Sequence, residues 1–256
     1  MKDKIWIGLL TLVWLVLMGN IIWEGTQGQW RILDAEKIGN LEVAKYTDQL
    51  IVVAVSEEGT MLSLYERSGA KNSFEESEDE GAALSLKEKK RPGGTEWKLI
   101  LETPAMIGKN GLGKTKEGDG KTPSGVFSFV KAFGILENPG TELEYTQVDE
   151  SHYWVDDGNS KYYNQFVSVR EVTPDWTSAE HIVEYEECYR YVLATSYNVE
   201  RIRGKGSAVF LHCTSDQGEG TAGCIAVPEV YMREIMKRIK QQCILVIDER
   251  EKIVLY

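Results

Sequence analysis

A chain of 256 residues is long enough for one sizeable domain and a membrane segment, or for two small domains. Its apolar content of 42% can fill a packed core, and its formal net charge of −11 argues against a surface that binds nucleic acid or anionic lipid. Its four cysteines form no CxxC pair, which excludes a zinc ribbon, and they are too few to make a disulfide framework in a chain of this size.

The N-terminal residues 5–23 carry no charge, and as a helix they would span about 28 Å, close to the thickness of a bilayer core. Lys2 and Lys4 precede this run and Glu24 follows it. This pattern predicts that residues 1–4 are cytoplasmic and that the rest is exported. Since neither an A-x-A-like cleavage site nor a lipobox cysteine follows, we expect an uncleaved single-pass signal anchor in the cell membrane. A removed signal peptide is the alternative.

The next part of the chain changes from an unpatterned segment to strands. Residues 24–48 are interpreted as a spacer. The β-branched, apolar residues 49–55 predict a buried strand, and the alternation over 61–65 predicts a second strand after a turn at Gly59. These two strands should form a hairpin. The charged residues 71–94 end in Pro-Gly-Gly, which favours an exposed loop.

A strand predicted over 96–101 is followed by a glycine-rich segment, 108–125, which holds six glycines and four lysines. Its spacing does not match G-x-x-x-x-G-K-[ST] and no helical pattern follows, so we reject a phosphate-binding loop. We expect a long, turn-rich loop with a tight turn over 122–125, leading into a strand over 126–129.

Polar clusters occupy the middle of the chain. Asp156 and Asp157 are adjacent, so on a strand they would face opposite sides, and a turn or capping role is favoured over a shared carboxylate site. Residues 178–188 have helix-like spacing, with Ser178 as the cap. His181 lies in a polar stretch and is expected at the surface.

The last third predicts strands over 191–194, 207–212 and 243–247, and a helix that starts at Pro228 with Tyr231, Ile235 and Ile239 on its core face. Cys188 and Cys243 have apolar or aromatic neighbours and are interpreted as core or free thiols, while a disulfide between them stays open. About eight strands, two short helices and no βαβ alternation predict a mainly β, sandwich-like fold.

A histidine and a cysteine flank a polar, glycine-rich loop, and together they suit thiol catalysis. His212 ends a predicted strand and Cys224 follows Gly223. An imidazole can take the thiol proton, and a glycine leaves room for a substrate carbonyl and for a turn that directs the Cys224 N–H at an oxyanion. The group that orients the imidazole could be the Thr221 hydroxyl or a carbonyl near Gly223, with Asp216 as a weaker candidate.

Two other interpretations of these residues stay open. One is a metal site made of His212, Cys213 and Cys224, although adjacent strand residues face opposite sides. The other is a purely structural role for the histidine and the cysteine.

His212 and the segment Thr221-Ala-Gly-Cys-Ile-Ala226 resemble the catalytic signature of the L,D-transpeptidase (YkuD-type) family. That signature is a histidine, a variable loop and then Ser/Thr-His-Gly-Cys-Ile/Val-Arg. The segment 121–127, KTPSGVF, is similar to the T-P-x-G-x-F segment of the family. The resemblance extends over roughly 49–248, and it implies that residues 49–256 form a β-sandwich-like catalytic domain outside the cytoplasmic membrane.

The resemblance also implies an activity, the joining of peptidoglycan stem peptides through a thioester without a cofactor. Cys224 would be the nucleophile, His212 the general acid and base, and Gly223 part of the oxyanion site. The residues expected to support the histidine or the substrate are Thr221, Ala222 and Ser215. The donor would be a stem tetrapeptide that loses its terminal D-residue, and the acceptor an amine of another stem or water.

Two positions depart from the family signature. Ala222 stands in place of its histidine, and Ala226 in place of its arginine. We therefore expect a divergent branch, with an L,D-carboxypeptidase-type hydrolase or an inactive cell-wall-binding protein as the alternatives to a transpeptidase.

Overall fold

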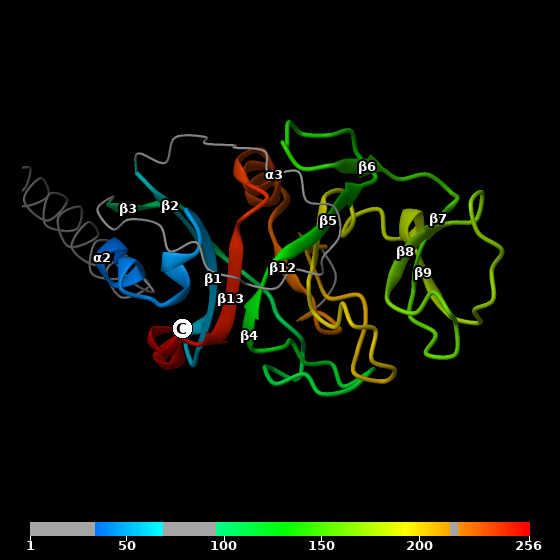
Figure 1. Ribbon diagram of the computed structural model, residues 1–256, viewed down its shortest axis with the longest axis horizontal. Helices are drawn as coiled ribbons and strands as arrows, with labels where there is room; N and C mark the ends of the chain where they lie inside the picture. Colours follow the sequence, from blue (N-terminus) through cyan, green and yellow to red (C-terminus); the bar gives the residue numbers. More distant parts are fainter. Residues whose placement is uncertain (1–33, 69–95, 216–219) are drawn as a thin grey trace, which may run out of the picture. The chain divides into compact units, whose positions relative to one another are not determined.

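The computed structural model of this chain describes residues 34–68, 96–215 and 220–256 (Figure 1). The predicted signal anchor over 5–23, the predicted loop over 71–94 and Asp216 lie outside the described residues. Among the helices that are described, none has both the length and the apolar character needed to cross a membrane. The compact unit treated below runs from Ala35 to Tyr256.

The described residues are rich in strands. These are β1 (Gln49–Ser56), β2 (Gly59–Arg67), β3 (Trp97–Pro104), β4 (Gly125–Phe127), β5 (Phe129–Gly134), β6 (Tyr145–Gln147), β7 (His152–Val155), β8 (Gln165–Ser168), β9 (Ala179–His181), β10 (Val192–Thr195), β11 (Phe210–Cys213), β12 (Ile225–Val227) and β13 (Ile244–Glu249). The helices are α2 (Ala35–Gly39), α3 (Glu229–Arg238) and the 3-10 helices η1 (Val43–Lys45), η2 (Ile182–Glu184) and η3 (Arg250–Leu255). The prediction of a mainly β fold with a few short helices is confirmed.

One five-stranded sheet, here called sheet A, has the strand order β3-β2-β1-β13-β4. The predicted hairpin is present, because β1 and β2 pair antiparallel from Gln49 opposite Glu66 to Ser56 opposite Gly59. On its other edge β1 pairs parallel with β13, the last strand of the chain. The first six residues of β1 are buried, as an apolar strand in the middle of a sheet requires.

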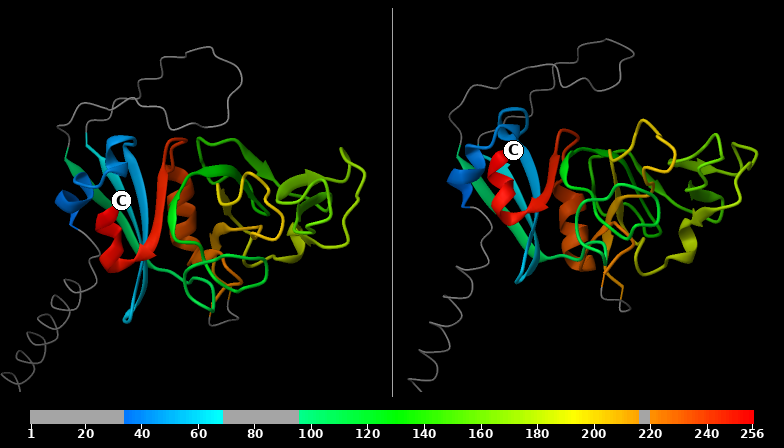
Figure 2. Two further views of the ribbon diagram at one scale, coloured as in Figure 1. Left: turned by 60° about the horizontal axis from the view of Figure 1, so that its bottom comes forward. Right: turned by 90° about the horizontal axis from the view of Figure 1, so that it is seen from below.

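The second five-stranded sheet, sheet B, has the order β12-β11-β10-β5-β6. Figures 1 and 2 show α3 lying between sheet A and sheet B. The two sheets and the helix enclose what we call the central core. Its fully buried members include Ile51, Val53, Leu62, Leu64, Leu193, Leu211, Ile225, Ile235, Leu245 and Ile247.

A three-stranded sheet, sheet C, has the order β8-β7-β9 and lies on the side of sheet B away from sheet A (Figure 1). Between sheets B and C is a smaller aromatic core that holds Phe133, Trp154, Tyr189, Phe210 and Cys224, among others. Phe210 lies at its centre, with ring centroids 4.7 Å from Trp154 and 5.6 Å from Phe133. Sheet B is therefore buried on both faces.

The helix predicted over 178–188 is wrong, because this stretch forms β9 and the short η2. Its residues pair with strand β7 of sheet C instead. Glu180 lies opposite Trp154, and the His181 ring stacks on Tyr153 with centroids 4.4 Å apart. His181 lies at the surface as expected, half-buried, with hydrogen bonds to the Glu184 side chain and the Glu150 carbonyl.

Smaller differences concern α3 and the predicted spacer. Pro228 precedes α3 rather than opening it, and Met232 and Met236 join Ile235 and Ile239 as the buried face, while Tyr231 is half-buried. Within 34–48, α2 and η1 pack onto the domain and bury Ile38, Leu41 and Ala44. These helices show that the compact unit includes part of the predicted spacer.

Two predictions about single residues are confirmed. Asp157 has the expected turn role, because its carboxylate accepts the N–H groups of Asn159 and Thr177 and the Thr177 hydroxyl. Cys188 and Cys243 are free thiols, and Cys243 is buried in the central core.

Candidate functional site

His212 and Cys224 lie on the same face of sheet B. β11 and β12 are parallel, and their register sets His212 opposite Ala226, with Cys224 two residues before Ala226. Because side chains alternate along a strand, Cys224, Ala226 and His212 point to one side, while Cys213 points to the other. Accordingly, Cys224 belongs to the aromatic core and Cys213 to the central core. The thiol and the imidazole are both buried, with 8% and 6% of the residue exposed.

The His212 ring is held by the backbone of its own strand. Its Nδ1 lies 2.7 Å from the carbonyl oxygen of Cys213. A carbonyl can only accept, so Nδ1 carries the proton and Nε2 of the neutral ring is left as the base. Burial lowers the pKa of His212 to about 4, although this hydrogen bond acts in the opposite direction. The imidazole is therefore neutral at pH 7, and the group that orients it is the Cys213 carbonyl, not one of the groups near Gly223 that we expected.

The Cys224 thiol is a neutral donor in this resting arrangement. It donates to the Ala208 carbonyl oxygen at 3.0 Å, and its sulfur accepts the Phe210 N–H at 3.3 Å. Burial and, next, the negative charge of Glu180 raise the pKa of the thiol to about 12, while the Phe210 N–H and the Lys114 ammonium lower it. The site thus rests as a neutral thiol and a neutral imidazole rather than as an ion pair.

The turn before Cys224 is stabilised by two threonine hydroxyls. Thr221 Oγ1 donates to the Cys224 carbonyl at 2.7 Å and accepts the Gly223 N–H at 3.0 Å. Thr122 Oγ1 donates to the Gly223 carbonyl at 2.8 Å and accepts the Gly108 N–H at 2.8 Å. A hydrogen bond therefore joins Thr122 of the T-P-x-G segment to the cysteine turn, 101 residues later in the sequence.

Position 223 requires glycine for two reasons. Its φ is 148°, in the region that side-chain-bearing residues rarely adopt. A Cβ there would also lie 2.8 Å from the Lys121 carbonyl oxygen. The absence of a side chain thus lets the Lys121 carbonyl pack directly against the backbone of residue 223.

The other predicted site residues surround this turn. Ala222 is exposed, Ser215 is half-buried, and Asp216 is outside the described residues. Ala226 is 2% exposed and is joined to Met106 by two backbone hydrogen bonds, of 2.8 and 2.9 Å. The position that carries arginine in the family signature therefore carries a small buried side chain on the same face of sheet B as the thiol.

Asn164 is a structural link that the sequence did not predict as part of the site. Its Oδ1 accepts the Trp154 indole N–H at 3.0 Å and the Ala208 N–H at 3.2 Å, and its Nδ2 donates to the Asn198 carbonyl at 2.8 Å. Asn164 and Ala208 both have positive φ, 54° and 52°. Ala208, whose carbonyl accepts the Cys224 thiol, is therefore held through its N–H by a side chain from the loop between β7 and β8. The only signal in the sequence was an aromatic–amide cluster, Tyr162-Tyr163-Asn164.

Glu180 and Tyr189 form a second unforeseen pair beside the thiol. The Tyr189 hydroxyl donates to Glu180 Oε2 at 2.6 Å, and the tyrosine ring meets the His212 ring edge-on with centroids 5.5 Å apart. Burial raises the pKa of Glu180 to about 7, assisted by the negative charges of Asp156 and Glu117. Strand β9 thus sets an ionisable carboxyl within electrostatic reach of Cys224.

The geometry does not favour a metal site at this place. Cys213 lies in the core on the opposite face of sheet B from Cys224, so it cannot join His212 and Cys224 around one ion. Among the described residues, no group of three His, Cys, Asp or Glu side chains could hold a metal ion.

Comparison with known proteins gives a family match. The model of the L,D-transpeptidase catalytic domain, YkuD, matches residues 89–247. Solved structures that match include a cysteine-to-serine variant of the Enterococcus faecium L,D-transpeptidase, at 14% identity and a TM-score of 0.35, covering 79% of this chain and 50% of that one. Another is the Ldtfm–avibactam carbamoyl enzyme, at 14% identity and a TM-score of 0.36, covering 79% and 49%. This chain spans about half the length of those two chains. No curated protein matches it.

Proposed function

This chain belongs to the L,D-transpeptidase catalytic domain family, and we propose that it remodels peptidoglycan stem peptides through a thioester on Cys224. The observation that carries the proposal is the position of His212. Its ring is on the same face of sheet B as the thiol and is fixed with Nε2 as the free base. A neutral imidazole on the same face of the sheet as a neutral thiol is a suitable starting state for general-base activation of the nucleophile.

In the proposed first half-reaction the thiol leaves the Ala208 carbonyl, and its proton goes to Nε2 of His212 as the sulfur attacks a stem-peptide carbonyl carbon. The C–N bond to the terminal D-residue then breaks. The leaving amine takes the proton from His212, and the acyl group stays on Cys224 as a thioester.

In the second half-reaction an amine of another stem attacks the thioester carbonyl and gives its proton to His212. The C–S bond breaks, the sulfur recovers a proton, and the two stems are joined by an amide. If water takes the place of the amine, the product is a shortened stem, and the enzyme is an L,D-carboxypeptidase.

The test is acylation of the purified full-length chain by a stem tetrapeptide, followed by intact mass. We expect an adduct that has lost the mass of the terminal D-residue in the wild type and in Cys188→Ala, and no adduct in Cys224→Ala. Cys188 is a matched control because it is also a free thiol. Failure of the wild type to form an adduct, or an undiminished adduct in Cys224→Ala, would contradict the thiol mechanism and favour an inactive wall-binding protein.

Addition of an acceptor stem to the acyl-enzyme separates the two reactions. A cross-linked dimer in the mass spectrum supports the transpeptidase, whereas a tripeptide stem alone supports the hydrolase.

We also propose that residues 5–23 anchor the protein in the cell membrane with its catalytic domain outside the cytoplasm. The support is the uncharged run and the lysines before it. Protease added to intact cells should degrade the region after Trp23, and its protection would show that the orientation is wrong.

A further inference from the structure

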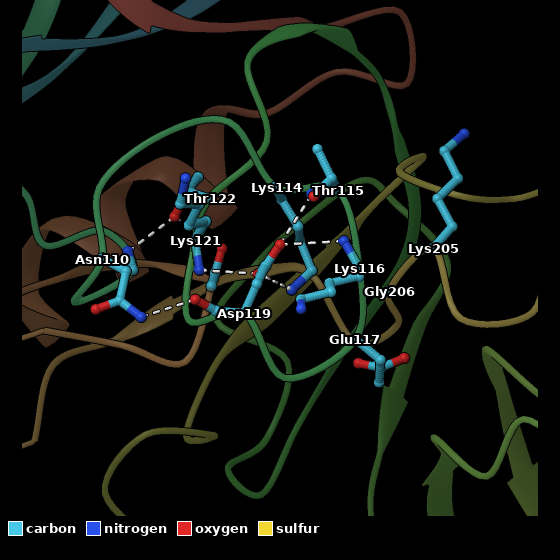
Figure 3. A network of polar contacts seen from close by, with 12 residues as sticks. Asn110, Lys114, Thr115, Lys116, Glu117, Asp119, Lys121, Thr122, Lys205 and Gly206 are labelled. Carbon is cyan, nitrogen blue, oxygen red and sulfur yellow. Dashed lines mark hydrogen bonds and ion pairs between the residues drawn. The ribbon is translucent and has the colours of Figure 1, made fainter.

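The side chain of Lys114 is buried in the glycine-rich loop, next to Asp119 (Figure 3). Only 3% of it is exposed. It passes Gly206, where an added Cβ would lie 2.5 Å from Lys114 Cε. It ends next to Gly223, where an added Cβ would lie 3.3 Å from Nζ. Both glycines therefore leave the space that this lysine fills.

The path of Lys114 is fixed by contacts on each side. Glu117 holds the segment with Gly206, because its N–H donates to the Gly204 carbonyl at 2.9 Å and its carboxylate accepts the Ser207 hydroxyl at 2.9 Å. At the other end, Lys114 Nζ lies 3.0 Å from Asp119 Oδ1. The ammonium is thus held between a carboxylate and the backbone of the nucleophile turn.

The two members of this ion pair differ in the number of hydrogen bonds that they make. Figure 3 shows Asp119 surrounded by donors: besides Lys114, it accepts the N–H groups of Thr115 at 2.8 Å, Lys116 at 3.1 Å and Lys121 at 3.0 Å. The ammonium has three N–H donors, and among the described residues it bonds to Asp119 alone. Within the described part of the chain, Asp119 therefore uses one of the three donors of this almost fully buried cation, and a negative charge that forms near the other two would be stabilised.

A purely structural role explains this arrangement less well. Buried ion pairs contribute little to stability compared with apolar side chains of the same size. A methionine could fill the space next to Gly223 without bringing a buried charge. Packing alone therefore does not explain why a positively charged side chain is buried at this position.

Apart from the Phe210 N–H, which donates to the Cys224 sulfur, the neighbours of the thiol named above do not favour a negative charge on it. The neighbour of the thiol on the same face of sheet B is Ala226, where the family signature has arginine, and Glu180 opposes negative charge on the sulfur. The Lys114 ammonium acts in the opposite sense and lowers the pKa of Cys224.

We propose that Lys114 is the electrostatic partner of Cys224, a cation that stabilises the negative charge formed at the nucleophile turn when the thiol loses its proton. It acts through space and takes no proton. Its importance for catalysis rests on the proposed acyl transfer, but its effect on the thiol does not, so the two can be tested separately.

The test is the pH dependence of Cys224 alkylation by iodoacetamide in the full-length chain, in a Cys188→Ala background, with the modified residue identified by peptide mass. Lys114→Met should raise the apparent pKa of the thiol and slow alkylation at pH 8 about tenfold, as one pKa unit implies. Lys114→Arg should stay close to wild type. Lys116→Met removes the same charge from an exposed position of the same loop and should change nothing.

Identical profiles for Lys114→Met and wild type would overturn the proposal. If Lys114→Met does not fold, Lys114→Met with Asp119→Asn removes both charges and should show the same slower alkylation. If that variant also fails to fold, the lysine is a structural ion-pair partner and the proposal fails. No stem peptide is used, so a negative result in the acylation test leaves this measurement intact.

Discussion

The Cys224 thiol and the Ala208 carbonyl are joined by a hydrogen bond of 3.0 Å, and Ala208 makes this bond from a left-handed backbone conformation with φ 52°. An alanine in this region is strained, and here the strain directs a carbonyl at the nucleophile. The bond holds the protonated thiol in a fixed orientation in the resting site.

Ala208→Gly should remove that strain and raise the free energy of unfolding by roughly 1 kcal/mol. Urea denaturation measures the difference. Ala222→Gly is the matched control, because Ala222 is exposed and is not among the described residues with positive φ, so glycine there should lower stability. An Ala208→Gly variant that is less stable than wild type would show that the conformation is not strained.

Thr122→Val should loosen the cysteine turn. The substitution keeps the shape of a fully buried side chain but removes the donor to the Gly223 carbonyl and the acceptor of the Gly108 N–H. We expect a loss of about 2 kcal/mol in the free energy of unfolding and slower acyl-enzyme formation. Thr115→Val, at an exposed position of the same loop, should change stability by less than about 0.5 kcal/mol. Equal effects of the two variants would argue against the role given to Thr122.

Glu180→Gln should make Cys224 more reactive. The amide still accepts the Tyr189 hydroxyl, but the charge that opposes the thiolate is gone. The apparent pKa from iodoacetamide alkylation should fall, the opposite of the Lys114→Met result, and the gain should be larger above pH 7, where Glu180 of the wild type is ionised. Glu184→Gln, an exposed partner of His181, is the control. If the apparent pKa of the thiol is the same in Glu180→Gln and wild type, the Glu180 carboxyl is too far from Cys224 to affect it.

The acid limb of kcat/KM should fall near pH 4 and not near 6.5, because His212 must be neutral to act as the base and burial lowers its pKa to about 4. The same shift has a consequence for stability. As the pH falls below 6.5, His212 is protonated in the unfolded chain but stays neutral in the folded chain until about pH 4. The free energy of unfolding therefore decreases across this range. His212→Gln should weaken that decrease. An acid limb close to 6.5 would mean that the imidazole is solvated.

The features of the fold and the site that depend on neighbouring residues could be predicted from the sequence. The hairpin of β1 and β2 follows from β-branched and alternating residues, and the opposite directions of His212 and Cys213 follow from strand geometry. The helix predicted over 178–188 is wrong because the spacing of this stretch fits a helix, while its actual partners, in β7, lie 24 to 28 residues earlier in the chain.

Long-range contacts account for what the sequence did not reveal. Nothing near Lys114 indicates that its ammonium ends beside Gly223, more than a hundred residues later. Likewise, Asn164 reaches Ala208 only because the loops around β8 and β11 come together in the fold. Such residues carry no motif of their own, since their role is set by tertiary packing.

The position of β13 sets an order of events in folding. Residues 244–249 pair with β1 on one side and β4 on the other, so the strand closest to the C-terminus fills an interior position of sheet A. Until it inserts, the hairpin of β1 and β2 has an exposed apolar edge, and the central core lacks one wall. Closing the sheet joins segments almost two hundred residues apart, which makes folding slow. A chain cut before residue 244 should therefore aggregate through the open edge of β1 rather than keep a partly working site.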